Sequence, residues 1–175
     1  MKRLFFALWP DDESRHQIDQ INQKVSLTGI RKLIPDNLHI TLVFLGNVDD
    51  ETAAAVEERA AEIIAPQVTL KFDELDFWPK PKVLCLTCRK QPKAIYELVN
   101  ALTTMVSAYP IRLDPRPFRA HITLARKATV RPDIQVQPII MQFDRFVLVR
   151  SSSTEAGVKY DVLASWPLQQ TTSPD

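Results

Sequence analysis

Residues 35–42 read Pro-Asp-Asn-Leu-His-Ile-Thr-Leu, and residues 117–124 read Pro-Phe-Arg-Ala-His-Ile-Thr-Leu. In both stretches a proline stands four residues before a histidine, and the histidine begins the same His-Ile-Thr-Leu sequence. With twelve threonines in 175 residues, a given histidine has about a 7% chance of a threonine two positions later. Two such matches among only three histidines indicate a duplicated chain with one motif in each half.

The sequence before each motif repeats the same order of elements. Residues 3–9 are apolar and aromatic, as in a buried strand, and the acidic residues 11–13 that follow suit a helix N-terminus. Residues 83–88 form the matching strand in the second half, and apolar residues at helical spacing follow it over 95–106. Each half is therefore predicted to run strand, helix, strand.

Further elements are predicted outside this repeat. Residues 51–65 have a helical pattern, with Val56, Ala60, Ile63 and Ile64 directed inward. Strands are predicted at 68–78, 143–152 and 158–166, the last two joined by a hairpin turn at 154–157. The polar tail from 169 to 175 is expected to be frayed. Because no linker of domain-separating length occurs, we expect one domain over 1–175, with motifs around 35–46 and 117–126.

The spacing within each motif predicts a polar site. Residues i and i+2 of a strand face the same side, so His39 shares a face with Thr41, and His121 with Thr123. If the two strands lie near a pseudo-two-fold axis, two imidazoles and two hydroxyls converge. Histidine acts as acid or base near neutral pH. In-line displacement puts the attacking and leaving oxygens on opposite sides of phosphorus, so two imidazoles suit this reaction better than one.

Positive charge gathers around the second motif, although the whole chain has a net charge of only +1. This balance gives no broad electrostatic footprint for long nucleic acids. Asp114 is the one acid in the basic stretch 112–131, and Arg126, just beyond Thr123, is the best candidate for binding phosphate or stacking on a base. The basic residues of this stretch are Arg112, Arg116, Arg119, Arg126, Lys127 and Arg131.

The remaining features predict no cofactor, metal site or membrane segment. Cys85 and Cys88 lack the further ligands of a zinc site and are interpreted as small buried hydrophobic residues. His16 is expected on the surface of the first helix. The apolar start is interrupted by Pro10 and an acidic run, unlike a signal peptide, so a cytoplasmic protein is predicted.

These motifs resemble those of the two-histidine phosphoesterases. The resemblance is strongest to the RNA 2′,3′-cyclic phosphodiesterase branch, also called the 2′-5′ RNA ligases. It rests on Arg3-Leu4-Phe5-Phe6-Ala7, on residues 37–46, and on residues 116–126 ending at Arg126. It implies a monomeric, bilobal α+β fold with pseudo-two-fold symmetry, a mainly antiparallel sheet in each lobe and helices on the outside. The implied activity is metal-independent hydrolysis of RNA-terminal 2′,3′-cyclic phosphate to a 2′-phosphate, with 2′-5′ ligation as a weak reverse reaction.

The resemblance also implies residue roles. By its position, His39 resembles the acid that protonates the leaving O3′, and His121 resembles the base that activates water. Pseudo-symmetry permits the reverse assignment. Thr41, Thr123 and Arg126 would surround the phosphate. Phe5 would stack on a base or pack in the core.

Two other functions stay open at this point. One is a phosphodiesterase acting on a small cyclic nucleotide or on an ADP-ribose cyclic phosphate. The other is a non-catalytic module that binds RNA ends or nucleotides. The completeness of both motifs argues against the second alternative, because binding alone does not require two proton-transfer groups.

Overall fold

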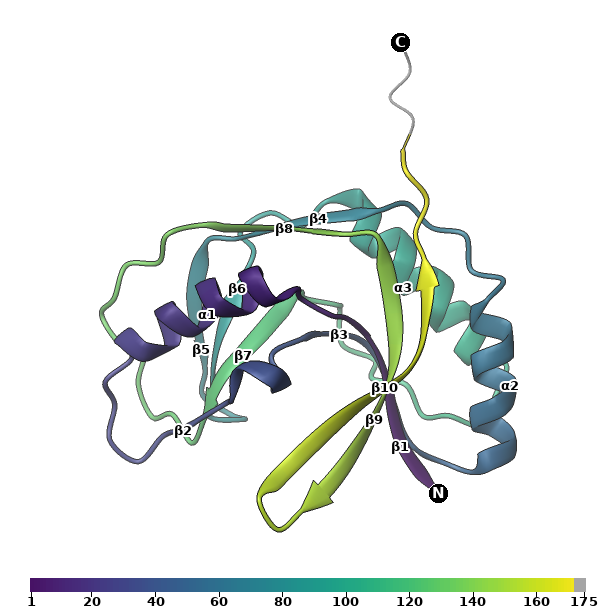
Figure 1. Cartoon of the computed structure of the whole chain (residues 1–175), viewed down its shortest axis with the longest axis horizontal. Coiled ribbons are helices and arrows are strands. Elements are labelled where there is room, and N and C mark those ends of the chain that lie inside the picture. Colours follow the sequence, from purple (N-terminus) through teal and green to yellow (C-terminus); the bar gives the residue numbers. More distant parts are fainter. Residues whose placement is uncertain (172–175) are drawn as a thin grey trace.

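Two four-stranded antiparallel sheets form the molecule, together with a two-stranded sheet (Figure 1). The computed structural model describes residues 1–171. The first sheet has the order β10-β9-β1-β3, the second β2-β7-β6-β5, and the third pairs β4 with β8. The strands are β1 (Lys2–Leu8), β2 (Arg31–Lys32), β3 (Ile40–Val48), β4 (Val68–Phe72), β5 (Glu74–Trp78), β6 (Val83–Thr87), β7 (His121–Arg126), β8 (Ile139–Phe143), β9 (Arg145–Thr154) and β10 (Gly157–Pro167).

Both predicted strand-helix-strand repeats are present, as β1-α1-β3 and β6-α3-β7, which confirms the α+β prediction. Asp11 caps α1 (Asp12–Lys24) by accepting a hydrogen bond from the Ser14 amide at 2.7 Å, in the acidic stretch predicted to begin the helix. The predicted apolar stripe of α3 (Lys93–Val106) is buried throughout. The remaining helices are α2 (Asp50–Ala60) and the short 3-10 helix η1 (Pro35–Asn37).

The two helices of the repeat pack across the halves. Asn22, near the end of α1, donates a hydrogen bond of 3.0 Å to the Leu124 carbonyl in β7 of the second sheet. Figure 1 shows α1 lying over β5, β6 and β7, while α3 lies on the side of the first sheet. Buried apolar residues of both halves form one cluster, in which Ile40 and Ile122 are fully buried. No helix within residues 1–171 is long and apolar enough to cross a membrane.

A β-bulge occurs at the same position of both motifs. Ala7 pairs with Thr41 while Phe6 pairs with Val43, so Leu42 is an extra residue in β3. Cys85 pairs with Thr123 while Leu84 pairs with Ala125, so Leu124 is an extra residue in β7. A bulge shifts the alternation of the side chains that follow it.

Several predicted boundaries were wrong. The strand predicted at 68–78 is two strands in different sheets, β4 and β5, separated at Asp73. β8 was not predicted, and β9 begins at Arg145. The second helix ends at Ala60, and Ile64 is 75% exposed rather than directed inward.

The C-terminal predictions met different outcomes. The hairpin turn at 154–157 is confirmed, since Thr154 pairs with Gly157 between β9 and β10. The tail is ordered at its start, because the Gln169 amide donates to the Ala65 carbonyl at 2.9 Å and its carbonyl accepts from the Gln67 amide at 2.8 Å. The last predicted frayed residues, 172–175, lie outside the described residues.

Candidate active site

The two motif histidines are held by equivalent hydrogen bonds. His39 Nδ1 lies 2.7 Å from the Asn37 carbonyl oxygen, and His121 Nδ1 lies 2.9 Å from the Arg119 carbonyl oxygen. A carbonyl can only accept, so in each ring Nδ1 carries a proton and donates it. Nε2 of each neutral ring is thereby left as the basic nitrogen, the position from which an imidazole exchanges protons with a substrate.

The predicted alternation of side chains holds in both motifs. The isoleucine that follows each histidine is fully buried, while His39, Thr41, His121 and Thr123 are half-buried on the opposite face. The Thr41 hydroxyl lies 3.0 Å from His39 Nε2. Within residues 1–171 the Thr123 hydroxyl makes no corresponding bond to His121, so the two halves differ in this contact.

Both imidazoles have lowered pKa values. The pKa of His39 is lowered to about 4, mainly by burial, with smaller contributions from the charges of His121, Arg15 and Arg126 and an opposing effect of the hydrogen bond to the Asn37 carbonyl. Burial also lowers the pKa of His121, assisted by Arg119, Arg126 and Arg116. The charge of His121 therefore acts on His39, and the lowered pKa values favour the neutral form of both rings at neutral pH.

The basic cluster divides into paired and unpaired cations. Arg116 forms an ion pair with Asp114, and Arg119 forms one with Asp76. Arg126 makes no side-chain hydrogen bond or ion pair within residues 1–171, and its charge acts on both histidines. Among residues 1–171, the structure thus brings the two predicted histidines together with Arg126, a cation that has no side-chain partner.

Aromatic side chains surround the His39 ring, and this was not predicted. The ring centroids of Phe5 and Tyr160 both lie 4.9 Å from that of His39, and Trp9 stacks at 5.9 Å. Phe5 is only 3% exposed and packs against His39, which agrees with the second of the two roles expected for it, packing in the core. Trp9 lies in turn under the Arg15 guanidinium at 4.9 Å.

Arg15 connects α1 to the first motif. Its Nε donates to the Pro10 carbonyl at 3.0 Å, and Nη1 donates to the carbonyl of Pro35, the proline that begins the motif. The side chain is buried although it is charged. Sequence analysis gave no signal for this role, because an arginine in an amphipathic helix usually lies at the surface.

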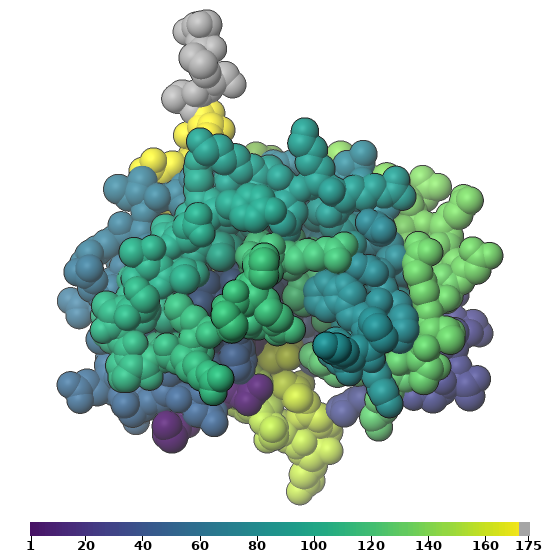
Figure 2. All heavy atoms as spheres, turned by 180° about the vertical axis from the view of Figure 1, so that it is seen from behind, coloured from purple at the N-terminus to yellow at the C-terminus, as the bar shows by residue number. Residues whose placement is uncertain are grey.

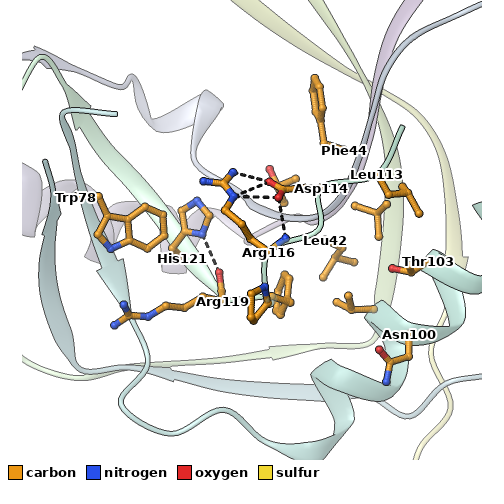
Figure 3. Close-up of a pocket in the computed structure, with 15 residues that line it drawn as sticks. Leu42, Phe44, Trp78, Asn100, Thr103, Leu113, Asp114, Arg116, Arg119 and His121 are labelled. Atoms are coloured by element: carbon orange, nitrogen blue, oxygen red, sulfur yellow. Dashed lines mark hydrogen bonds and ion pairs between the residues drawn. The ribbon is translucent and has the colours of Figure 1, made fainter. Parts of the chain in front are cut away.

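Thr41 and His121 are among the residues that line a cavity of about 610 Å³. Its walls come from β3, from α3 and from the segment 113–119, as Figure 3 shows. Figure 2 shows this face hollowed between the segment around residues 110–120 and the segment around residue 80. Leu42, Val99, Leu113 and Phe118 give an apolar lining, with Asn100 and Thr103 as polar groups. Cavities of this size and composition suit small organic ligands.

The cysteines are buried, as predicted. Burial raises the pKa of Cys85 to about 12 and that of Cys88 to about 11, so both thiols are protonated and unreactive at neutral pH. His16 is exposed on α1, also as predicted. Its Nε2 lies 3.1 Å from the Gln20 amide nitrogen. Residues 1–171 contain no cluster of three or more His, Cys, Asp or Glu side chains suited to a metal ion.

Comparison with known proteins gives consistent similarities. The family model described as LigT like Phosphoesterase matches residues 8–85 and again residues 86–160. The chain is 32% identical over 174 residues to the RNA 2′,3′-cyclic phosphodiesterase of Escherichia coli (strain K12), covering 97% of this chain and 98% of that protein. It is 30% identical over 136 residues to the protein of the same name from Archaeoglobus fulgidus, covering 75% and 76% of the two chains.

The solved structures agree with these sequence similarities. The crystal structure of E. coli LigT complexed with 3′-AMP superposes with a TM-score of 0.88 at 32% identity, covering 97% of this chain and 99% of that chain. The apo form of the same protein gives a TM-score of 0.85 at 31% identity, over 97% and 98% of the two chains.

Proposed function

Since the chain belongs to the LigT-like phosphoesterase family, we propose that it hydrolyses the 2′,3′-cyclic phosphate at RNA ends and leaves a 2′-phosphate. The observation that carries this proposal is the equivalent anchoring of His39 and His121. Each ring donates from Nδ1 to a backbone carbonyl and keeps Nε2 for proton transfer. Relatives named RNA 2′,3′-cyclic phosphodiesterase support the same substrate class.

In the proposed reaction, His121 Nε2 removes a proton from water as the water oxygen attacks phosphorus. The bond between phosphorus and O3′ breaks, and O3′ takes a proton from His39 Nε2, so the 2′-phosphate and a free 3′-hydroxyl result. His39 must be protonated beforehand, and the negative charge of the bound phosphodiester favours this by raising its pKa. Thr41, Thr123 and Arg126 stabilise the non-bridging oxygens. No metal takes part.

The cavity lined by Thr41 and His121 supports the proposal of a nucleoside substrate. It is next to the proposed phosphate position, and its apolar walls offer a surface for a base. RNA ends and nucleotides with a 2′,3′-cyclic phosphate are therefore the proposed partners. A cytoplasmic location and a monomeric state remain predictions.

A substrate panel with two variants tests this function. The substrates are an RNA oligonucleotide ending in 2′,3′-cyclic phosphate, 2′,3′-cyclic AMP and ADP-ribose 1″,2″-cyclic phosphate, with the product termini mapped. We expect the RNA to be the preferred substrate, with His39→Ala and His121→Ala each lowering kcat about 10²–10⁴-fold, the usual contribution of one acid or base. His16→Ala, an exposed histidine on α1, is the matched control.

Four outcomes would count against the proposal. A loss below tenfold in either variant would remove that histidine from the chemistry. Preference for one of the small substrates would indicate the alternative phosphodiesterase, and binding of all three without turnover would indicate a non-catalytic module. The wild-type rate should also be unchanged by EDTA, and inhibition reversed by a divalent metal would contradict the metal-independent mechanism.

A further inference from the structure

Asp76 lies on β5 and binds two neighbours of His121. Its Oδ2 accepts a hydrogen bond from Trp78 Nε1 at 2.9 Å and forms an ion pair with Arg119 Nη2 at 3.1 Å. Its Oδ1 accepts from the Phe77 amide at 2.8 Å. Both carboxylate oxygens are therefore engaged, which fixes the side chain against β5.

The two residues that Asp76 binds both contact the His121 ring, Trp78 through its side chain and Arg119 through its backbone carbonyl. The Trp78 ring centroid lies 4.5 Å from that of His121, and the Arg119 carbonyl accepts the hydrogen bond from His121 Nδ1 at 2.9 Å. The Arg119 guanidinium is also 5.9 Å from the Trp78 ring centroid. Figure 3 shows Trp78 beside His121, with the Arg119 side chain extending past both.

We propose that Asp76 is a positioning residue for His121. This inference rests on the proposed function and extends it to a residue that touches neither substrate nor imidazole. By anchoring Trp78 and Arg119, Asp76 fixes one face of the His121 ring and the residue that binds Nδ1, and so directs Nε2 toward the attacking water. Proton transfer depends on such orientation, because small displacements of a catalytic group reduce the rate strongly.

Asp76 also bears on the charge around His121, through its ion pair with Arg119. The cations that act on His121 are Arg119, Arg126 and Arg116, and His39 lies close enough to interact with it. The Asp76 carboxylate partly neutralises Arg119 and so makes it easier for His121 to accept a proton. At His39, in comparison, the stacked Trp9 ring lies under the Arg15 guanidinium. Asp76 thus favours the proton-accepting role of His121.

The test compares Asp76→Asn with Asp73→Asn. Asparagine removes the negative charge with little change of volume. Asp73, just before β5, is the matched control. Like Asp76 it forms an ion pair, with Lys71, and accepts a backbone hydrogen bond, from the Arg89 amide, but it does not contact His121. We expect Asp76→Asn to lower kcat at least about tenfold with KM within about threefold, because substrate binding is retained while the ring loses its orientation. Asp76→Glu should recover part of the loss, and Asp73→Asn should keep the wild-type kcat.

NMR titration of the His121 imidazole in the free protein provides a readout independent of turnover. In Asp76→Asn the His121 pKa should fall, since Arg119 is left uncompensated, while the His39 pKa should stay nearly unchanged. Equal loss of kcat in both asparagine variants, or an unchanged His121 titration in Asp76→Asn, would overturn the proposal. If the chain failed to hydrolyse cyclic phosphates, the proposed function would fall but the titration would still test the link between Asp76 and His121.

Discussion

The two imidazoles proposed to transfer protons are chemically alike but differ in their surroundings. His39 is enclosed by Phe5, Trp9 and Tyr160, whereas His121 lies against Trp78 in a cavity wall. Closer burial explains why His39 has the pKa that is lowered to about 4. The duplicated motif therefore supplies two imidazoles whose environments are not equivalent.

These pKa values predict the pH dependence of the reaction. The active form has one imidazole protonated and the other neutral, and its fraction is greatest between the two apparent pKa values of the pair. Because both values are lowered in the free protein, kcat/KM should be bell-shaped with its maximum below pH 6.5, the ordinary histidine pKa. Bound phosphate favours the protonated rings, so the kcat maximum should lie at higher pH than that of kcat/KM.

Steady-state kinetics over the pH range, with buffers of constant ionic strength, measures both profiles. A kcat/KM maximum at or above pH 7 would contradict the lowered pKa values. A profile with a single limb would mean that only one histidine transfers a proton, contrary to the proposed mechanism.

Single residues of the site could be predicted from the sequence only where a motif carried them. His39, Thr41, His121 and Thr123 stand in a repeated pattern whose spacing fixes a common face. Trp78 and Asp76 occur in an ordinary alternating strand, and nothing local indicates that β5 lies in the same sheet as the second motif. Their role depends on β6 pairing both with β5 and with the distant β7, and the spacing within a strand does not contain that pairing.

At the scale of secondary structure, the bulge in β7 determines where Arg126 points. In an unbroken strand, Arg126 would lie on the face opposite His121 and Thr123. The extra residue Leu124 shifts the alternation, so that Leu124 and Ala125 are both buried and Arg126 returns to the exposed side. The Leu124 carbonyl accepts hydrogen bonds from the Leu33 amide and from Asn22, which satisfies it where the ladder is disrupted.

Arg126→Ala should therefore act on catalysis rather than on folding. We expect kcat/KM to fall about 10²-fold, since the variant removes the cation from the developing negative charge, and Arg126→Lys to recover part of it. Arg145→Ala, which removes an exposed arginine beside Asp144, is the control and should keep the wild-type value. Kinetics and thermal unfolding of the three variants test this, and a loss of less than about threefold in Arg126→Ala would exclude its role.

A change in which side chains face inward also limits what could be predicted about strands. The repeated strand-helix-strand units were recognisable because each helix has a strong apolar period. In residues 68–78 the buried positions are 68, 70 and 72 and then 75, so the inward face changes at Asp73. A local pattern cannot show this change, because it follows from β4 pairing with the distant β8 while β5 pairs with β6.

At the scale of the whole molecule, the first strand and the last two strands lie in one sheet. β9 pairs with β1, so the first sheet is complete only when the last strands have formed. α1 binds the second sheet through Asn22, and the largest buried cluster contains residues of both halves. We propose from these connections that residues 1–175 form a single domain, in which neither repeat is stable alone.

Equilibrium unfolding tests this proposal with a pair of equivalent core variants. Ile40 and Ile122 occupy the same motif position in different sheets, and both are fully buried. Replacing either by alanine should reduce the free energy of unfolding by about 2–5 kcal/mol, the usual cost of a large-to-small core substitution. If the two lobes unfold together, urea unfolding should show one transition in each variant, coincident by tryptophan fluorescence and far-UV circular dichroism, with its midpoint lowered. Two separated transitions, of which Ile40→Ala shifts only one and Ile122→Ala only the other, would show instead that the lobes are independent domains.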